Sequence, residues 1–304
     1  MSENATPARR RLFDQAWLLM MLPPLFWSSN AVLGRAVSGE VPPVGLAFWR
    51  WTLGMLLVLP FAWRHLRHDA RALARHWPVV LLLSGLGIAV FNTFLYVGLH
   101  TTTALNAVMM QSSMPVLIVL MSLALFGDRV TPLQGLGIAV SLVGALTLIA
   151  RGDPAVLIGL QLNAGDLWVL AAVLGYAAYT ALLRRRPAVH GLSFIAVTFA
   201  GGAAMLLPFY LWESIGGDPM PLSPTALGAV AYVALFPSIA AYLCFNRAVA
   251  LVGANTAGMC IHLMPVFGSI LAILFLGEQP HLYHAAGIGL IAAGILLATR
   301  RTKS

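Results

Sequence analysis

The sequence predicts an all-α integral membrane protein with ten transmembrane helices, arranged as two five-helix repeats of inverted topology. Three observations lead to this prediction. Sixty per cent of the 304 residues are hydrophobic and only 9% are charged, against roughly 25% charged in an ordinary soluble protein. Apolar runs of about 20 residues, long enough to cross a hydrocarbon layer of roughly 30 Å, recur along the chain. The second half also repeats a pattern of the first at a constant offset of 150 positions.

The repeat is clearest in two stretches that end in Met-Pro. Residues 104–115 read "ALNAVMMQSSMP", and residues 254–265 read "ANTAGMCIHLMP". Each stretch leads through an apolar run to a glycine and an acid, at 127–128 and at 277–278. A chain that repeats itself at half its length is made of two copies of one unit.

Ten apolar runs define the expected spans. We place them at residues 17–37, 45–63, 77–99, 104–126, 132–150, 166–183, 193–212, 225–245, 254–276 and 282–299. Five fall in each half, so residues 1–151 form the first repeat and residues 152–304 the second, within one membrane domain. The connections are short. The longest are the basic segment "RHLRHDARALARH" and the Gly/Pro-rich segment "ESIGGDPMPLSP".

The basic residues predict the orientation of the chain. Lysine and arginine gather at the amino terminus, in the basic segment, at Arg184, Arg185 and Arg186, and at the carboxyl terminus. Cytoplasmic segments carry such an excess, so both termini are expected in the cytoplasm. Because five is odd, the second repeat starts on the opposite side from the first. Inverted repeats favour a substrate site at their interface near mid-bilayer, so the architecture indicates transport.

Three motifs carry a resemblance to a known family. They are "FWSSNAVLGR" in the first span, "PPVGLAFWR" at the start of the second, and the paired Met-Pro to Gly-acid blocks. Residues 17–301 resemble the drug/metabolite transporter superfamily in its ten-helix EamA-type branch, and are most similar to bacterial exporters of aromatic and other amino acids. One departure is Asp128, where the family more often has glutamate; an acid is still kept at the helix end.

The resemblance implies two interlocked four-helix groups around a central cavity, with the fifth and tenth spans outside as supports. It implies a multi-pass protein of the bacterial inner membrane that moves small metabolites by alternating access, without nucleotide hydrolysis. The expected partners are a small-molecule substrate and the lipid bilayer. We expect no cofactor, no metal and no nucleic acid, and either a monomer or a homodimer.

Polar side chains inside apolar spans are the first candidates for the site, since they are costly in hydrocarbon. Trp27, Ser29 and Asn30 follow Pro23 and Pro24, whose missing N–H groups leave backbone carbonyls available. These residues either line a cavity or hydrogen-bond between helices.

A second set shows the repeat directly. Asn92 and Tyr96 lie four residues apart on one helical face. At the 150-residue offset stand Tyr242 and Asn246, the same two residue types exchanged. The four side chains either bind a ligand or form a gate, or they hold the two halves together; we favour the first interpretation.

The Met-Pro stretches provide a third set. Gln111 and Ser112 belong to the first copy and His262 to the second. Pro115 and Pro265 are expected to kink oppositely directed helices on either side of the cavity. His262 either carries protons, or binds a carboxylate, or is a neutral hydrogen-bonded cavity residue; we favour the neutral form.

The sixth span adds Trp168, Tyr176 and Tyr179. An aromatic cavity would suit aromatic or apolar amino acids, although Trp168 lies near a span end and also fits an interfacial belt. Arg50, inside the second span near its outer end, either binds a substrate carboxylate or snorkels to the interface or pairs with Glu40. We favour a structural role for it.

These observations favour a transporter that exports small metabolites, above all aromatic or apolar amino acids. No aspartate or glutamate lies in mid-span, which weakens obligatory proton coupling. Small residues at 137, 141 and 145, and at 285, 289 and 293, are spaced for close helix packing or for a dimer contact. One alternative is a transporter of other metabolites or drugs. A membrane enzyme is a weaker one, because no catalytic motif or converging nucleophile appears.

Overall fold

The fold is a bundle of helices, seen in a computed structural model that describes residues 15–37, 39–102, 104–276 and 279–299. No β-strand occurs among these residues. In chain order the helices are α2 (Ala16–Ala36), α3 (Pro43–Arg75), α4 (Trp77–Ser84), α5 (Phe91–Thr101), α6 (Ala104–Ser112), α7 (Met114–Phe126), α8 (Pro132–Ile149), α9 (Pro154–Ile158), α10 (Ala164–Leu182), α11 (Gly191–Ile215), α12 (Pro224–Val233), α13 (Ala241–Val252), α14 (Ala254–Gly258), α15 (Leu263–Leu276) and α16 (Leu282–Thr299).

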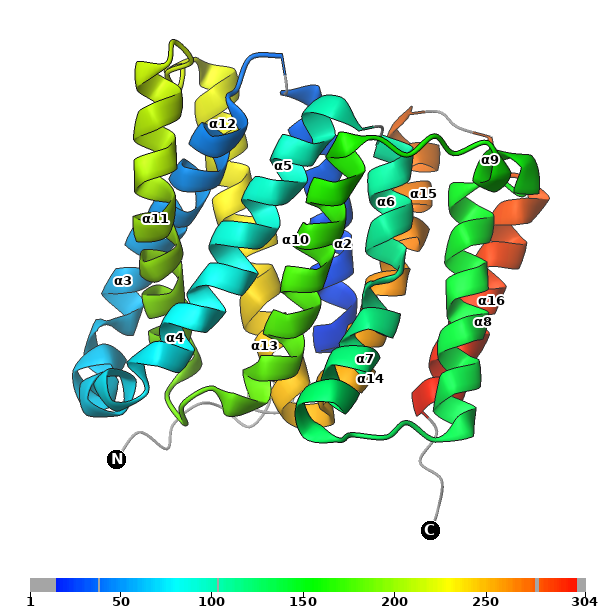
Figure 1. Cartoon of the computed structure of the whole chain (residues 1–304), viewed down its shortest axis with the longest axis horizontal. Helices are drawn as coiled ribbons and strands as arrows, with labels where there is room; N and C mark the ends of the chain where they lie inside the picture. The colour runs from blue at the N-terminus through cyan, green and yellow to red at the C-terminus, as the bar shows by residue number, and fades with distance from the viewer. Residues whose placement is uncertain (1–14, 38, 103, 277–278, 300–304) are drawn as a thin grey trace.

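Most of these helices are long and apolar enough to cross a membrane. Within the described residues, eight helical segments meet that requirement, and the bent pair α6 and α7 makes a ninth. The first expected span, α2, is a continuous helix of 21 residues with Pro23 and Pro24 inside it. Helix α2 begins and α16 ends on the same side of the bundle (Figure 1). The terminal basic clusters and the second Gly-acid pair, residues 277–278, lie outside the described residues.

The basic segment after the second span is helical, and here the sequence-based boundary was wrong. Helix α3 does not stop near Trp63 but continues to Arg75, over 33 residues. Arginine, alanine and leucine are good helix formers, so the chain keeps its helical form beyond the apolar run. Arg64, Arg67 and Arg71 recur at three- to four-residue intervals on its exposed side. The extension is held by Asp69, whose Oδ2 accepts a hydrogen bond from the His190 backbone N–H at 3.0 Å.

Two π-helical segments interrupt equivalent spans of the two halves. Residues Gly85–Val90 join α4 to α5, and residues Ala234–Ala240 join α12 to α13. A π turn breaks the regular ladder and leaves carbonyls open to other donors. The Gly87 carbonyl accepts from the Tyr242 hydroxyl at 2.5 Å. The Pro237 carbonyl, 150 residues further on, accepts from the Trp27 indole N–H at 3.1 Å. Aromatic residues thus fix both interruptions.

The packing of the helices repeats in the two halves. The second and seventh spans, α3 and α11, pack against each other, as do the fifth and tenth, α8 and α16. The third span packs on the sixth through α5 and α10, and the eighth packs on the first through α13 and α2. Exchanging each span for its equivalent five places along reproduces the same pairs. The fold is therefore a duplication.

Helices α8 and α16 meet through glycines that let their backbones touch. A Cβ atom at Gly294 would lie 2.5 Å from the Gly137 carbonyl oxygen and 2.5 Å from the Ser141 backbone nitrogen. Ser141 is fully buried in this contact. The small residues of α8 at 137, 141 and 145 are buried, as their spacing predicts, whereas those of α16 at 285, 289 and 293 are exposed. The buried side of α16 instead carries Gly287 and Gly294.

A Gly294→Ala variant is expected to lose stability, because the added methyl group must push the two helices apart. Overpacking of this kind costs about 1–3 kcal/mol. The matched control is Gly289→Ala on the same helix, where an added Cβ meets no atom within 4 Å. Melting temperatures of the purified proteins in detergent measure both. Equal melting temperatures for the two variants would contradict the close α8–α16 contact.

Candidate functional site

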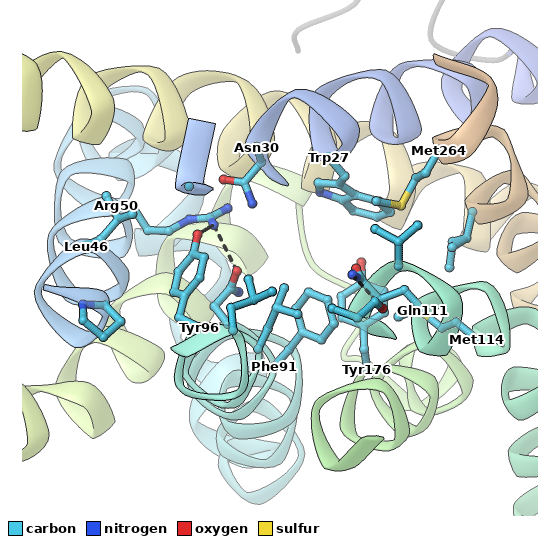
Figure 2. A pocket seen from close by; sticks show the side chains of 18 of the residues that line it. Trp27, Asn30, Leu46, Arg50, Phe91, Tyr96, Gln111, Met114, Tyr176 and Met264 are labelled. Atoms are coloured by element: carbon cyan, nitrogen blue, oxygen red, sulfur yellow. Dashed lines mark hydrogen bonds between the residues drawn. The ribbon is translucent and has the colours of Figure 1, made fainter. Parts of the chain in front are cut away.

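A cavity of about 270 Å³ lies between the two halves. That volume is near the lower end of small-molecule sites, which span roughly 300–1,000 Å³. Helices α2, α3, α5, α6, α10 and α13 contribute to its wall, together with the ends of α7 and α15; no lining residue comes from α8, α11 or α16 among the described residues. Figure 2 shows one end of the cavity with Arg50, Asn30 and Tyr96, and the other end with Trp27, Gln111, Met114, Tyr176 and Met264.

Arg50 is the most highly connected polar group of the cavity. Its side chain is only 1% exposed, although the residue lines the cavity. Nη1 donates to Asn92 Oδ1 and to the Tyr96 hydroxyl, both at 3.0 Å. Nε donates to Ser238 Oγ at 2.9 Å, and Ser238 in turn donates to the Val233 carbonyl. The guanidinium therefore joins α3 to α5 and to the second π segment.

Two of the alternatives that the sequence left open for Arg50, a place at the interface and a pair with Glu40, do not fit this geometry, whereas a structural role and a bond to a substrate carboxylate both do. The guanidinium neither reaches the interface nor pairs with Glu40, since its hydrogen bonds go to side chains of the cavity. The ring of Trp51 covers one of its faces, with Cζ 4.5 Å from the ring centroid. Such a contact stabilises a cation by about 0.5–2 kcal/mol.

Three buried polar groups of the cavity wall have no hydrogen-bond partner. They are Asn30 Oδ1, Asn92 Nδ2 and the Tyr176 hydroxyl. The amide of Asn92 cannot be turned over, because its oxygen must accept from Arg50. Its amino group is therefore a fixed donor. Buried groups of this kind are normally satisfied in folded proteins. Since none of the three atoms has appreciable accessible surface, a ligand in the cavity reaches them when neighbouring side chains of the wall shift.

Aromatic rings close the cavity on the side where α2 begins. The indole of Trp27 packs edge-on against Tyr176 and Tyr242, with centroids 5.7 Å and 6.3 Å away. Tyr179 packs on Tyr176 at 5.3 Å, and Phe245 lies 5.3 Å from Trp27. Offset and edge-on ring pairs are favourable beyond the area that they bury. These five residues form what we call the aromatic floor.

Besides Arg50, seven of the thirteen site candidates from the sequence line the cavity: Trp27, Asn30, Asn92, Tyr96, Gln111, Tyr176 and Tyr242. The other six lie elsewhere. Trp168 is 44% exposed and packs on Phe94. Ser29 bonds to the Tyr232 hydroxyl at 2.7 Å, and Tyr179 donates to Asn246 Oδ1 at 2.9 Å. Ser112 and His262 lie behind the wall, bonded to each other.

The two Met-Pro stretches differ in shape. The chain bends by 41° between α6 and α7, at Ser113, two residues before Pro115. Before Pro265 there is instead one turn of tighter 3₁₀ helix, Met259–His262, between α14 and α15. Gln111 and Ile261, equivalent by the repeat, both line the cavity.

His262 is fully buried between the Met-Pro stretches and α8. Its Nε2 lies 2.9 Å from the Ser112 carbonyl and its Nδ1 lies 2.7 Å from Ser141 Oγ. A carbonyl only accepts, so Nε2 carries the hydrogen and Nδ1 can accept from the serine hydroxyl. Both nitrogens are satisfied in the neutral form. His262 itself does not line the cavity.

Known proteins resemble the chain over nearly all of its length. The model of the EamA-like transporter family matches it twice, over residues 15–150 and 163–300. The uncharacterized transporter YyaM of Bacillus subtilis is 27% identical over 291 residues, 93% of each chain. A "Probable terminal-alkyne amino-acid exporter" of Streptantibioticus cattleyicolor is 27% identical over 233 residues, 76% of each chain. One crystal structure matches with a TM-score of 0.77 at 23% identity, over 95% of this chain and 99% of the other, and shows the fold.

The duplicated match coincides with the duplicated packing, and the apolar helices make the protein a multi-pass membrane protein. Many transporters with internal structural repeats bind their substrates at the interface of the repeats, and the cavity of this protein lies between its two halves. The chain belongs to the EamA-like transporter family and is a membrane transporter.

Proposed function

We propose that the protein exports small metabolites, above all amino acids with an aromatic or apolar side chain, by alternating access through the cavity. The observation that carries the proposal is the division of the cavity into two ends. Arg50, Asn92 and Tyr96 form a charged end, and Trp27 and Phe91 line the remainder together with aliphatic residues and the uncharged amide of Gln111. An amino acid has the same division, a charged head on an apolar body. A relative named as a probable amino-acid exporter supports the substrate class.

The topology that we propose has ten spans, with residues 1–151 and 152–304 as inverted repeats and both termini in the cytoplasm of a bacterium. It is supported by the start of α2 and the end of α16, which lie on the same side of the bundle as the carboxyl-terminal ends of α3 and α10 (Figure 1). Basic residues belong to the last turns of α3 or directly follow α10, among them Arg71 and Arg185. In this topology the cavity, which is walled by Val41 and Pro43 at the outer ends of α2 and α3, faces outward. The aromatic floor separates it from the cytoplasm. We propose a monomer or a homodimer in the inner membrane.

We further propose exchange or facilitated transport as the driving mode. Among the described residues, no aspartate or glutamate lines the cavity, and His262 is satisfied as a neutral ring. Proton-driven transporters commonly carry a titratable group on the substrate path.

Counterflow in proteoliposomes tests this function. Vesicles loaded with one amino acid at high concentration are expected to accumulate the same labelled amino acid, with phenylalanine and leucine ahead of glutamate and lysine. Imposing a pH gradient is expected to leave the initial rate unchanged. If no amino acid exchanges while other metabolites do, the amino-acid assignment is wrong and the protein transports another class.

A further inference from the structure

We infer that the transported molecule carries a carboxylate, and that Arg50 together with the amino group of Asn92 binds it. The inference rests on the proposed function in one respect, that the cavity is the transport site. It deepens that function, because it names the group of the substrate that is recognised and the two side chains that bind it.

The first step is the charge of the cavity. Arginine stays protonated at every physiological pH, so Arg50 places a permanent positive charge in a site that is almost fully closed. All three of its hydrogen-bond partners, Asn92, Tyr96 and Ser238, are neutral. Within the described residues no carboxylate pairs with it, and none lines the cavity. Buried charges in proteins are normally paired, so the cavity lacks an anion.

The second step is the set of free donors. The hydrogen bonds of Arg50 use Nε and Nη1, and the described part of the chain gives Nη2 no partner. Asn92 Nδ2 has no partner either, and the bond from Arg50 fixes its orientation. A carboxylate has two oxygens that each accept hydrogen bonds, and charge-assisted bonds to arginine are among the strongest in proteins. Two unused donors on adjoining groups fit one carboxylate.

The third step places the rest of the ligand. Asn30 reaches into the cavity from α2 beside the Arg50 side chain (Figure 2), and its Oδ1 is an unused acceptor. An ammonium group next to the carboxylate would donate to it. The apolar body would then extend toward Trp27 and Phe91. The site therefore selects an α-amino carboxylate over an amine.

A purely structural Arg50 is the rival explanation, with Trp51 and three neutral acceptors as its only partners. Ligand chemistry separates the two without any mutation. L-phenylalanine, 3-phenylpropionate, L-phenylalaninamide and phenethylamine share one apolar body, and only the first two carry a carboxylate. We expect both to inhibit counterflow and to quench the tryptophan fluorescence of the purified protein. The amide and the amine are expected to bind at least ten-fold more weakly.

An Asn92→Asp variant provides the second measurement. The new carboxylate would pair with Arg50 from within the cavity and occupy the place of the ligand's own. Affinity for L-phenylalanine is expected to fall at least ten-fold, while affinity for phenethylamine stays or rises. Arg75→Gln, at the exposed end of α3, is the matched control and is expected to leave both affinities unchanged.

The outcomes separate the two proposals. If the amide or the amine binds as tightly as L-phenylalanine, the carboxylate requirement is wrong while amino-acid transport stands. If 3-phenylpropionate and other carboxylates bind but no amino acid exchanges, the amino-acid function is wrong while the carboxylate requirement stands. If only molecules without a carboxylate bind or exchange, both are wrong. Should Asn92→Asp fail to fold, the four-ligand series on the unmodified protein decides alone.

Discussion

An Arg50→Met variant is expected to fold with normal stability and to lose at least 100-fold in the rate of amino-acid exchange. Methionine has a similar length and can pack on Trp51 in place of the arginine stem. Replacing buried ionic groups by apolar side chains of similar volume is often neutral or stabilising by about 1–4 kcal/mol, since the desolvation of the charge is avoided. A 100-fold loss of rate corresponds to about 2.7 kcal/mol of lost transition-state stabilisation.

The groups left behind in this variant can be satisfied. Ser238 keeps its bond to the Val233 carbonyl at 2.8 Å, and Asn92 and Tyr96 both line the cavity, where water can reach them. Thermal unfolding in detergent and counterflow in proteoliposomes measure the two effects separately. Arg75→Met, at the exposed end of α3, is the matched control for the loss of one arginine. A variant that is strongly destabilised but still exchanges amino acids would show that Arg50 is a structural residue only.

Most of the spans could be predicted, because the length of an apolar run decides whether its helix can cross a membrane. The runs placed at residues 77–99 and 282–299 coincide with helical segments of the structure. The end of α3 could not be predicted in the same way. Hydropathy marks where a helix leaves the hydrocarbon, whereas the helix continues to Arg75 because its backbone bonds and helix-forming residues continue. The π segments also carry no hydropathic signal. Gly87 in the first segment and Pro237 in the second stand at equivalent positions of the repeat.

The site was partly predictable. Asn92 and Tyr96 could be placed on one helical face from their spacing alone, and the repeat added Tyr242. Their partners could not be placed, because these come from helices far away in the chain. The bond from Tyr179 diverts Asn246 from the cavity, and Ser141, 121 residues from His262, holds that histidine behind the wall.

The repeat contains a signal for the cavity position of Arg50 that the sequence motifs alone do not give. Position 200, 150 residues after Arg50, is alanine, and position 177, 150 residues after Trp27, is alanine as well. A residue that serves the common scaffold should recur in both halves. Arg50 and Trp27 each lack a counterpart of the same residue type at the equivalent position of the second half, and both line the cavity. These two departures from the internal symmetry lie at the charged end of the cavity and at its aromatic floor.

Trp27 leads to the second large prediction, since it joins the cavity to the aromatic floor. A Trp27→Ala variant is expected to take up labelled substrate even into vesicles that contain no substrate, because removal of the indole opens the aromatic floor. The indole contacts Tyr176, Tyr242 and Phe245, and its N–H is bonded to the Pro237 carbonyl. Since Trp27 is only partly buried, the loss of stability is expected at about 2–3 kcal/mol, below the 3–5 kcal/mol typical of fully buried tryptophan.

Trp27→Phe separates the two contributions of the side chain. The phenyl ring keeps much of the contact with Tyr176 but cannot donate to the carbonyl of Pro237, which is part of the second π segment. If the ring closes the floor, the phenylalanine variant retains exchange that depends on internal substrate, and only the alanine variant leaks. If the hydrogen bond to the π segment keeps the floor closed, both variants leak equally. Normal exchange by the alanine variant would show that the floor is not a gate, because an opened floor cannot hold a concentration difference across an outward-facing cavity.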